Sequence, residues 1–279
     1  MTTAPRRFAL LVAYHGRGLL GFARQAGGPT VQQALEEAWL AVRGETVVMH
    51  GSGRTDAGVH AWGQVVHFTT FRPLPPRRMR DALDAHLPRN VTVRACVEVS
   101  PGFHARRSAV GKHYLYRIAL GPHRPVLDQD VRAFLPGALD LAAMRHAARA
   151  LVGRRDFAAL AAAGRTVRDT VRRIDAVHLS EVRDGLVVHV RGEGFLYKMV
   201  RNLVGTLVEV GRGRRDPRWV EAVLASGDRR RAGPTAPPEG LVLWRVHYRE
   251  DPFRGLAAAR RRPYPGGPGA APPAPDPQA

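Results

Sequence analysis

One carboxylate, Asp56, stands between glycines and beside an arginine in the segment 53–61, which reads Gly-Arg-Thr-Asp-Ala-Gly-Val-His-Ala. The glycines around it permit positive φ and the close approach of another backbone or of a ligand. Arg54 offers a positive charge that would keep the carboxylate ionised and could also reach a phosphate. The segment therefore indicates a carboxylate displayed to an anionic partner. The alternative is a plain turn, in which Asp56 caps the backbone and Arg54 forms an ordinary surface ion pair.

The elements that would position this loop follow from the hydrophobic pattern of the first hundred residues. Strands are expected at residues 8–14, 46–50, 64–70 and 91–99, and helices at 30–42 and 77–86. Thr30 and Gln33 form a capping box, and apolar residues at helical spacing after them place Trp39 in the core. The order is β-α-β-β-α-β, with Asp56 between two strands.

The second half repeats this order. Strands are expected at residues 113–119, 171–179, 186–191 and 241–248, and helices at 141–151, 195–210 and 219–224. Asp140 caps the first of these helices and Gly211 ends the second. The expected fold class is α+β, with two ferredoxin-like halves, mainly antiparallel sheets and a basic cleft between them. The halves span residues 1–105 and 106–250, and the Pro/Gly/Ala-rich residues 251–279 form a disordered tail.

The composition predicts a partner of opposite charge. The chain has 279 residues, with 43 Lys and Arg against 24 Asp and Glu, so its net charge of +19 favours binding to a polyanion such as nucleic acid. No apolar run approaches the length that crosses a bilayer. The single Cys96 rules out an intramolecular disulfide, and neither the cysteine nor the histidines form a metal-ligand pattern. We expect a cytoplasmic protein without metal or cofactor.

Several segments together resemble the tRNA pseudouridine synthase A family, and the resemblance runs from residue 8 to residue 248. They are the segment 53–61, the Phe-His-Ala-Arg sequence at 103–106, the Lys-His-Tyr-Leu-Tyr strand at 112–116, the Met-Val-Arg-Asn sequence at 199–202 and the loop 232–241. The resemblance implies that Asp56 is the catalytic residue, that Tyr114 lies against the target base and that Arg201 forms an ion pair with Asp56. From pattern alone, Tyr114 is expected in the core. The same pattern leaves two positions open for Arg201, one paired with a carboxylate and one solvated on the outer face of its helix.

The implied activity is the isomerisation of uridine to pseudouridine in the anticodon stem-loop of tRNAs, at tRNA positions 38 to 40, by a homodimer that needs no cofactor. Asp56 would act in its ionised form, as nucleophile at the ribose C1′ or as base at C2′. The target base must leave its stack, and the ring of Tyr114 can recover roughly 1 to 3 kcal/mol of that cost.

Other residues are candidates for contact with the RNA. Arg54 joins Tyr114 and Arg201 as a substrate-binding residue. The further candidates for RNA contact are Arg17, Arg24, His60, Gln64, Arg106, Arg107, Arg168, Lys198 and Asn202. Taken one at a time, each basic side chain among them is more often a solvated surface charge.

The N-terminal loop departs from the family pattern. Where the family usually has Tyr-Asp-Gly and then Gly-Trp-Gln, this chain has His15, Phe22 and Ala23 at the Asp, Trp and Gln positions. These changes spare the catalytic segment but bear on how tRNA is chosen. They leave open an alternative, a catalytically inactive tRNA- or RNA-binding protein of the same fold. A DNA-directed base-flipping protein is a third possibility.

Overall fold

A computed structural model describes residues 4–162 and 169–256 of the chain. Its strands are β1 (Arg6–Tyr14), β2 (His50–Gly51), β3 (His60–Thr70), β4 (Val91–Val99), β5 (Ala109–Gly121), β6 (Ala133–Pro136), β7 (Gly153–Asp156), β8 (Val171–Val182), β9 (Gly185–Gly192) and β10 (Leu241–Tyr248). Its α-helices are α1 (Val31–Arg43), α2 (Pro76–His86), α3 (Leu141–Arg149), α4 (Met199–Gly211) and α5 (Trp219–Ser226). The expected α+β class is therefore confirmed.

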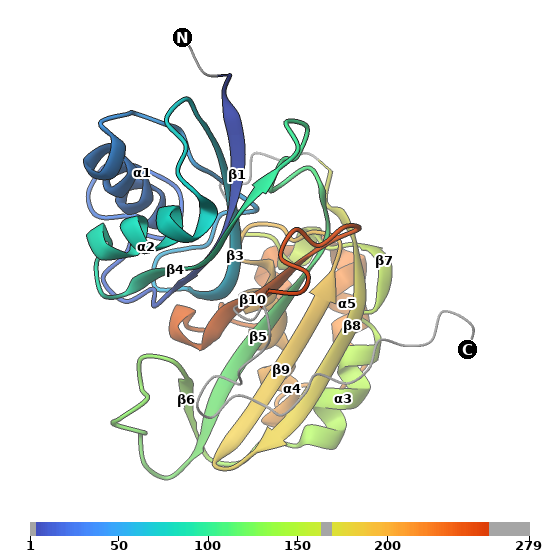
Figure 1. The fold of residues 1–279 in the computed structure, drawn as a ribbon. Coiled ribbons are helices and arrows are strands. Elements are labelled where there is room, and N and C mark those ends of the chain that lie inside the picture. Colours follow the sequence, from blue (N-terminus) through green and yellow to red (C-terminus); the bar gives the residue numbers. More distant parts are fainter. Residues whose placement is uncertain (1–3, 163–168, 257–279) are drawn as a thin grey trace.

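All the strands join one mostly antiparallel sheet, in the order β4-β1-β3-β10-β5-β9-β8-β7, with β2 added to β3 and β6 added to β5. Figure 1 shows α1 and α2 beside the first strands of this sheet, and α3 and α4 behind β8 and β9. Helix α1 begins at its predicted cap, where the Thr30 hydroxyl accepts a hydrogen bond from the Gln33 backbone amide at 3.3 Å. Trp39 is fully buried, as predicted.

The two halves meet through β10 and β3, which run parallel. Val242 pairs with His60 and Leu243 pairs with Ala61. Because β3 begins four residues after Asp56 and β5 lies on the other side of β10, this junction brings the Asp56 loop beside strands of the second half. The strand at the centre of the sheet is thus the last strand among the described residues.

Two predicted elements differ in the structure. The strand expected at 46–50 pairs with β3 only at His50 and Gly51, and the backbone amide of Met49 instead donates to the Glu36 carboxylate at 3.0 Å. The helix expected from residue 195 begins at Met199, because Lys198 has a φ of 56°, which an α-helix cannot accommodate. Strands β6 and β7 were not predicted, since four residues carry too little periodicity to be recognised.

Two of the predictions concern residues that the structure leaves undescribed. Arg168 and most of the predicted tail, residues 257–279, lie outside the described residues. Within residues 4–162 and 169–256, no helix has the length and apolar character needed to span a membrane.

Candidate active site

Asp56 lies on the loop between β2 and β3, and backbone contacts with the N-terminal loop fix its position. The Phe22 amide donates to the Thr55 carbonyl at 3.2 Å, and the Gly58 amide donates to the Leu19 carbonyl at 3.3 Å. A Cβ added at Gly21 would lie 2.3 Å from the Thr55 carbonyl oxygen, so this approach requires glycine. The N-terminal loop therefore supports the segment that carries Asp56.

Side chains hold the same loop at two further points. The hydroxyl groups of Tyr14 and Thr55 lie 2.8 Å apart in a buried hydrogen bond. Gln64 accepts from the Ser52 hydroxyl at 2.6 Å and donates to the Gly53 carbonyl at 2.9 Å. Both ends of the segment before Asp56 are thus tied to β1 and β3, which leaves the carboxylate on a firmly held backbone.

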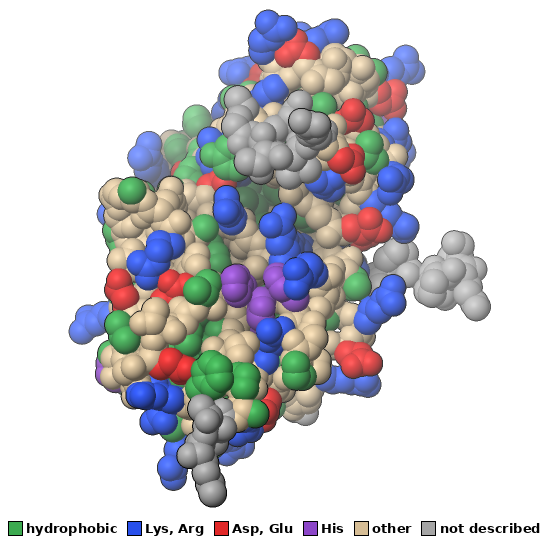
Figure 2. Space-filling model, turned by 90° about the horizontal axis from the view of Figure 1, so that it is seen from above, with side chains coloured by type: hydrophobic (Ala, Val, Ile, Leu, Met, Phe, Trp, Pro, Cys, Tyr) green, Lys and Arg blue, Asp and Glu red, His purple; other side chains and the backbone are tan. Residues whose placement is uncertain are grey.

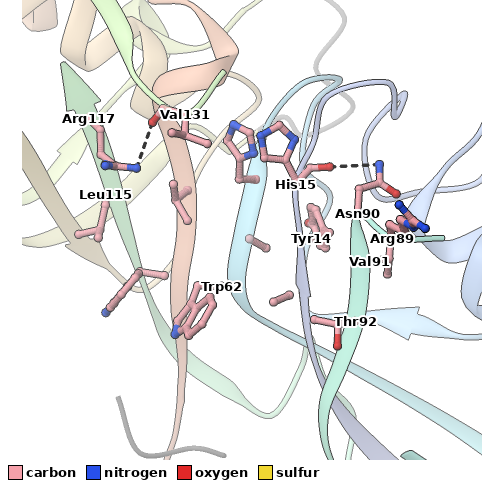
Figure 3. A pocket seen from close by; sticks show the side chains of 15 residues that line it. Tyr14, His15, Trp62, Arg89, Asn90, Val91, Thr92, Leu115, Arg117 and Val131 are labelled. Atoms are coloured by element: carbon pink, nitrogen blue, oxygen red, sulfur yellow. Dashed lines mark hydrogen bonds between the residues drawn. The ribbon is translucent and has the colours of Figure 1, made fainter. Parts of the chain in front are cut away.

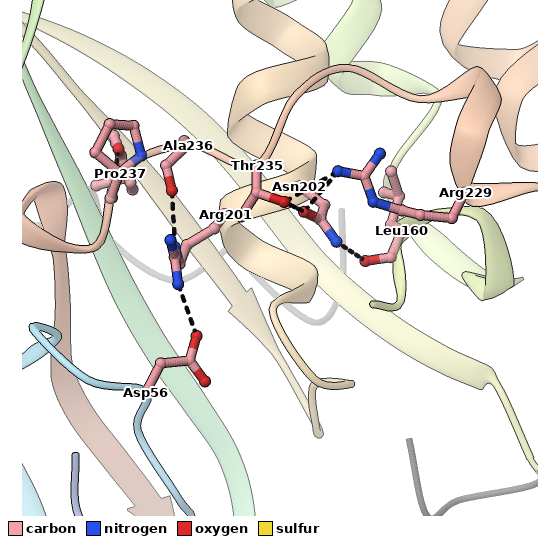
Figure 4. Close-up of polar contacts among 9 residues, drawn as sticks. Asp56, Leu160, Arg201, Asn202, Arg229, Thr235, Ala236 and Pro237 are labelled. Atoms are coloured by element: carbon pink, nitrogen blue, oxygen red, sulfur yellow. Dashed lines mark hydrogen bonds and ion pairs between the residues drawn. The ribbon is translucent and has the colours of Figure 1, made fainter. Parts of the chain in front are cut away.

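Arg201, in the first turn of α4, faces Asp56 across the junction (Figure 4). Its Nη1 atom lies 3.0 Å from Oδ2 of Asp56, and its Nε atom donates to the Ala236 carbonyl at 2.7 Å. The two side chains are only 11% and 20% exposed. The ion pair that the family resemblance implied is therefore present, in a site partly shielded from water, where a charge pair interacts more strongly than at the surface.

Asn202 organises the loop that holds Arg201. Its amide donates to the Leu160 carbonyl at 2.8 Å, and its Oδ1 atom accepts from the Thr235 hydroxyl at 2.7 Å and from Arg229 at 3.1 Å. Figure 4 shows these contacts meeting at the side of α4 behind Arg201. The roles of Thr235 and Arg229 were not predicted, because contacts between a helix and a loop about thirty residues later leave no periodic signal in the sequence.

Two tyrosines of β5, Tyr114 and Tyr116, lie on the same face of the sheet as the Asp56–Arg201 pair. Tyr114 is 8% exposed and packs edge-on against Phe195, with ring centroids 5.1 Å apart. Burial, followed by the neighbouring Tyr14 and Asp56, raises the pKa of Tyr114, so its phenol keeps its proton at neutral pH. Tyr116 donates to the Pro237 carbonyl at 2.8 Å and helps to seat the loop that carries Ala236.

Three of the predicted RNA contacts need correction. Gln64 and Asn202 are fully buried and His60 is 5% exposed, so these side chains lie inside the protein and not on a surface that RNA could contact. Gln64 and Asn202 hold the site together, as described above. His60 accepts a hydrogen bond from the Gly16 amide at 2.9 Å, and burial lowers its pKa to about 4.

His60 also lines a separate cavity of about 200 Å³. Figure 3 shows Trp62, Leu115 and Arg117 around it. Leu115 and Arg117 alternate along β5 with Tyr114 and Tyr116, so the cavity opens on the opposite face of the sheet from the Asp56–Arg201 pair. It is no part of the candidate active site.

The arginine and lysine side chains that were predicted to contact RNA differ in their exposure and in their partners. Arg54, Arg106 and Arg107 are exposed, and no ion pair joins Arg54 to Asp56 within the described residues.

Arg17 and Arg24 each pair with an acidic side chain, Asp130 and Glu36 respectively. Lys198 precedes α4 and lies 5.1 Å from the ring centre of Tyr197. Figure 2 shows Lys, Arg and His side chains gathered across the middle of one face of the molecule.

The departures in the N-terminal loop are accommodated by packing. Phe22 is 3% exposed and lies so close to Gly51 that a Cβ there would approach its ring to 2.4 Å. The ring of His15 meets that of His60 edge-on at 4.5 Å, and burial lowers the pKa of His15. Phe22 therefore serves as a core residue under β2.

In the part of the chain that the structure describes, no group of three or more His, Cys, Asp or Glu residues is placed to hold a metal ion.

Comparison with known proteins assigns the family. The sequence model described as tRNA pseudouridine synthase matches residues 10–106 and 147–249. The tRNA pseudouridine synthase A of Syntrophotalea carbinolica is 48% identical over 239 residues, which cover 86% of this chain and 95% of that protein. The tRNA pseudouridine synthase A of Geobacter sulfurreducens is 46% identical over 243 residues, covering 87% of this chain and 100% of that protein. The chain belongs to the tRNA pseudouridine synthase family.

Proposed function

We propose that this protein isomerises uridine to pseudouridine in the anticodon stem-loop of tRNA. In this reaction the bond between N1 of uracil and C1′ of the ribose breaks, the base turns, and a bond forms between C5 and C1′. The proton lost from C5 is balanced by one gained at N1, so nothing is oxidised or consumed. The observation that carries the proposal is the Asp56–Arg201 pair, set in a family of tRNA pseudouridine synthases.

Asp56 is the catalytic residue of this proposal. Both possible roles, attack on C1′ and proton removal at C2′, need a carboxylate held in a fixed position, and the Arg201 guanidinium pairs with it at 3.0 Å. The second hydrogen bond of Arg201, to Ala236, keeps the guanidinium in place when the substrate displaces the carboxylate from it. Arg201 thus orients Asp56 in the free protein and can bind the substrate during the reaction.

Tyr114 supplies the surface for the extruded uracil. Its ring lies on the face of β5 nearest Asp56, and a base that stacks there regains part of the energy lost on leaving the RNA helix. Because its pKa is raised, the phenol enters the reaction in its neutral form. Its hydroxyl group is then a hydrogen-bond donor to the base or a relay for the C5 proton.

We further propose that residues 1–105 and 106–250 form two ferredoxin-like halves with a basic cleft between them. The strand order supports this division. The first half has the order β4-β1-β3-β2, and the second has β10-β5-β9-β8, so in each half the fourth strand lies beside the first and the third beside the second. RNA bound between the halves would reach both Asp56 and Arg201.

A homodimer is also proposed. Val126 and Leu127, between β5 and β6, are 74% and 102% exposed and offer an apolar contact surface. Sedimentation equilibrium of the native protein tests the association. A dimer that persists after both residues are changed to Ser would place the interface elsewhere, and a monomer in the native protein would refute the proposal.

Tritium release tests the activity. A tRNA transcript labelled with tritium at C5 of uridine is incubated with the native protein and with Asp56→Asn, which keeps the shape of the side chain but removes its charge. We expect release by the native protein alone, with both proteins binding tRNA to a similar extent. Tight binding without release by either protein would support the alternative, an RNA-binding protein without turnover, and preferred binding to duplex DNA would support the third.

A further inference from the structure

Lys112 reaches the catalytic loop from β5. Along this strand Lys112 alternates with His113 and shares a face with Tyr114, the face that carries the candidate active site. A Cβ added at Gly53 would lie 2.7 Å from Nζ of Lys112, so the ammonium group rests directly over Gly53. Gly53 precedes Asp56 by three residues, which span at most about 11 Å of chain.

The ammonium group of Lys112 has no anionic partner there. The side chain is half-buried, and within residues 4–162 and 169–256 no carboxylate lies within ion-pair distance of its Nζ atom. The charged group that acts on it is another cation, Arg106. Burial and, to a lesser degree, Arg106 lower the pKa of Lys112 to about 8, so the side chain is still mostly charged at neutral pH. A partly buried cation without a counter-charge is unfavourable in the free protein, and an anion would relieve it.

We propose that Lys112 binds a backbone phosphate of the target nucleotide or of its immediate neighbour, and so fixes the RNA strand where the base leaves its stack. This inference rests on the proposed function, because it takes the RNA to be the anion. The reach from Gly53 to Asp56 confines the phosphate to the nucleotides nearest the reacting uridine. Arg106, which is exposed, adds positive potential on the same side.

Lys198, the other lysine of the chain, is itself a candidate for RNA contact, and it provides a comparison of equal charge. It lies at the start of α4, with its Nζ atom 5.1 Å from the ring centre of Tyr197. That contact gives its charge an aromatic partner, whereas Lys112 lacks a counter-charge. Removing the two lysine charges in turn therefore compares equal changes in net charge at two different places.

The first experiment compares Lys112→Met and Lys198→Met with the native protein in tritium release from an anticodon stem-loop RNA. We expect Lys112→Met to raise KM by about tenfold and to change kcat little, as loss of a binding contact requires. The dependence of binding on salt should also become shallower, by about 0.7 in the slope of log K against log salt, the value for one phosphate of a single strand. Lys198→Met should alter both quantities less.

A second experiment locates the phosphate. RNAs that carry a single uncharged methylphosphonate linkage, on either side of the target uridine, are assayed with the native protein and with Lys112→Met. One of these linkages should weaken binding by the native protein about tenfold and have little further effect on Lys112→Met, since the two changes remove the same contact. Gly53→Ala, which pushes Nζ aside without removing its charge, should raise KM in the same direction.

The outcomes separate this inference from the proposed function. Unchanged KM and salt dependence in Lys112→Met, with a native protein that releases tritium, would overturn the role of Lys112 and leave the isomerase intact. Equal losses from the linkages in native protein and variant would overturn it as well. A native protein that releases no tritium would refute the proposed function itself. Urea unfolding of Lys112→Met and a conservative Lys112→Arg variant, which should restore part of the affinity, guard against an effect of misfolding.

Discussion

The Nη1 atom of Arg201 lies 3.0 Å from the Oδ2 atom of Asp56, although 145 residues separate the two in the chain. The Nε atom of the same guanidinium is held by the Ala236 carbonyl at 2.7 Å. Arg201 is therefore fixed from one side before it meets the carboxylate on the other. A side chain held in this way can orient Asp56 without a large loss of conformational entropy during the reaction.

Arg201→Lys tests the need for both contacts. Lysine keeps the positive charge, but its single ammonium group cannot reach the Asp56 carboxylate and the Ala236 carbonyl with the fixed fork of a guanidinium. We expect kcat to fall by at least about tenfold while the Kd for tRNA stays within about threefold. Single-turnover tritium release and filter binding measure the two quantities. Arg107→Lys, at an exposed position, is the control, and an equal loss of kcat there would contradict the interpretation.

Gly205→Ala should disturb the support of Arg201. A Cβ at Gly205 would lie 1.7 Å from the Pro234 carbonyl oxygen, so α4 and the loop that carries Ala236 would have to move apart. We expect a loss of at least about 2 kcal/mol in the free energy of unfolding, together with reduced activity. Gly102→Ala is the matched control, because nothing lies within 4 Å of its added Cβ, and it should stay within about 0.5 kcal/mol of the native protein. Urea unfolding followed by circular dichroism decides between these outcomes.

Changes at Tyr114 should separate stacking from hydroxyl chemistry. Tyr114→Phe keeps the ring, so tRNA affinity should be nearly unchanged, while loss of the hydroxyl lowers kcat by at least about tenfold. Tyr114→Ala removes the ring as well and should weaken binding by about 1 to 3 kcal/mol. Stopped-assay kinetics with the anticodon stem-loop give kcat and KM for both variants. If Tyr114→Phe retained the native kcat, the hydroxyl would have no part in the reaction.

Stability should fall in acid because of buried histidines, and His67 provides the test. Burial, followed by the neighbouring His104 and His50, lowers the pKa of His67 to about 4, against about 6.5 in an unfolded chain. Between these two values the unfolded chain binds a proton that the folded protein does not. The free energy of unfolding therefore decreases as pH falls from about 6.5 to 4, by up to about 1.4 kcal/mol per pH unit for this residue.

His67→Asn should reduce that acid sensitivity. The Nδ1 atom of His67 accepts from the Ala105 amide at 3.2 Å, and an asparagine oxygen can take over this bond without titrating. Urea midpoints at pH 7 and pH 5 are compared for native protein and variant. A difference between the two pH values that is as large in the variant as in the native protein would assign the acid loss to other histidines, such as His60 and His189.

The sequence predicted most of the elements that carry the site, because their signals are local. The capping threonine and the apolar spacing of α1 depend on neighbours three and four residues away, and both Thr30 and Trp39 lie where that pattern places them. The start of α4 was misplaced, since the apolar pattern of Phe195 and Leu196 continues into the helix while the left-handed backbone of Lys198 does not. Nothing in the periodicity reveals such a single conformational exception.

Long-range contacts were beyond the reach of pattern alone. The Asp56–Arg201 pair was expected only through the family resemblance, and Lys112 was noted only as part of a basic strand. Asn202 was expected to contact RNA because it follows Arg201 in the sequence, but its side chain faces inward and bonds to Leu160 and Thr235. Only the path of the chain in space decides which neighbours such a side chain meets.

The position of β10 has a consequence for how the protein is made. This strand, Leu241–Tyr248, is the last of the sheet to leave the ribosome, yet it lies between β3 and β5 and joins the first half to the second. Until it emerges, β3 and β5 each lack one neighbouring strand, and the Asp56 loop has no strand to bring it beside α4. A nascent or prematurely ended chain therefore lacks the strand that joins its two halves, and we expect the Asp56–Arg201 pair to form only after translation has passed Tyr248.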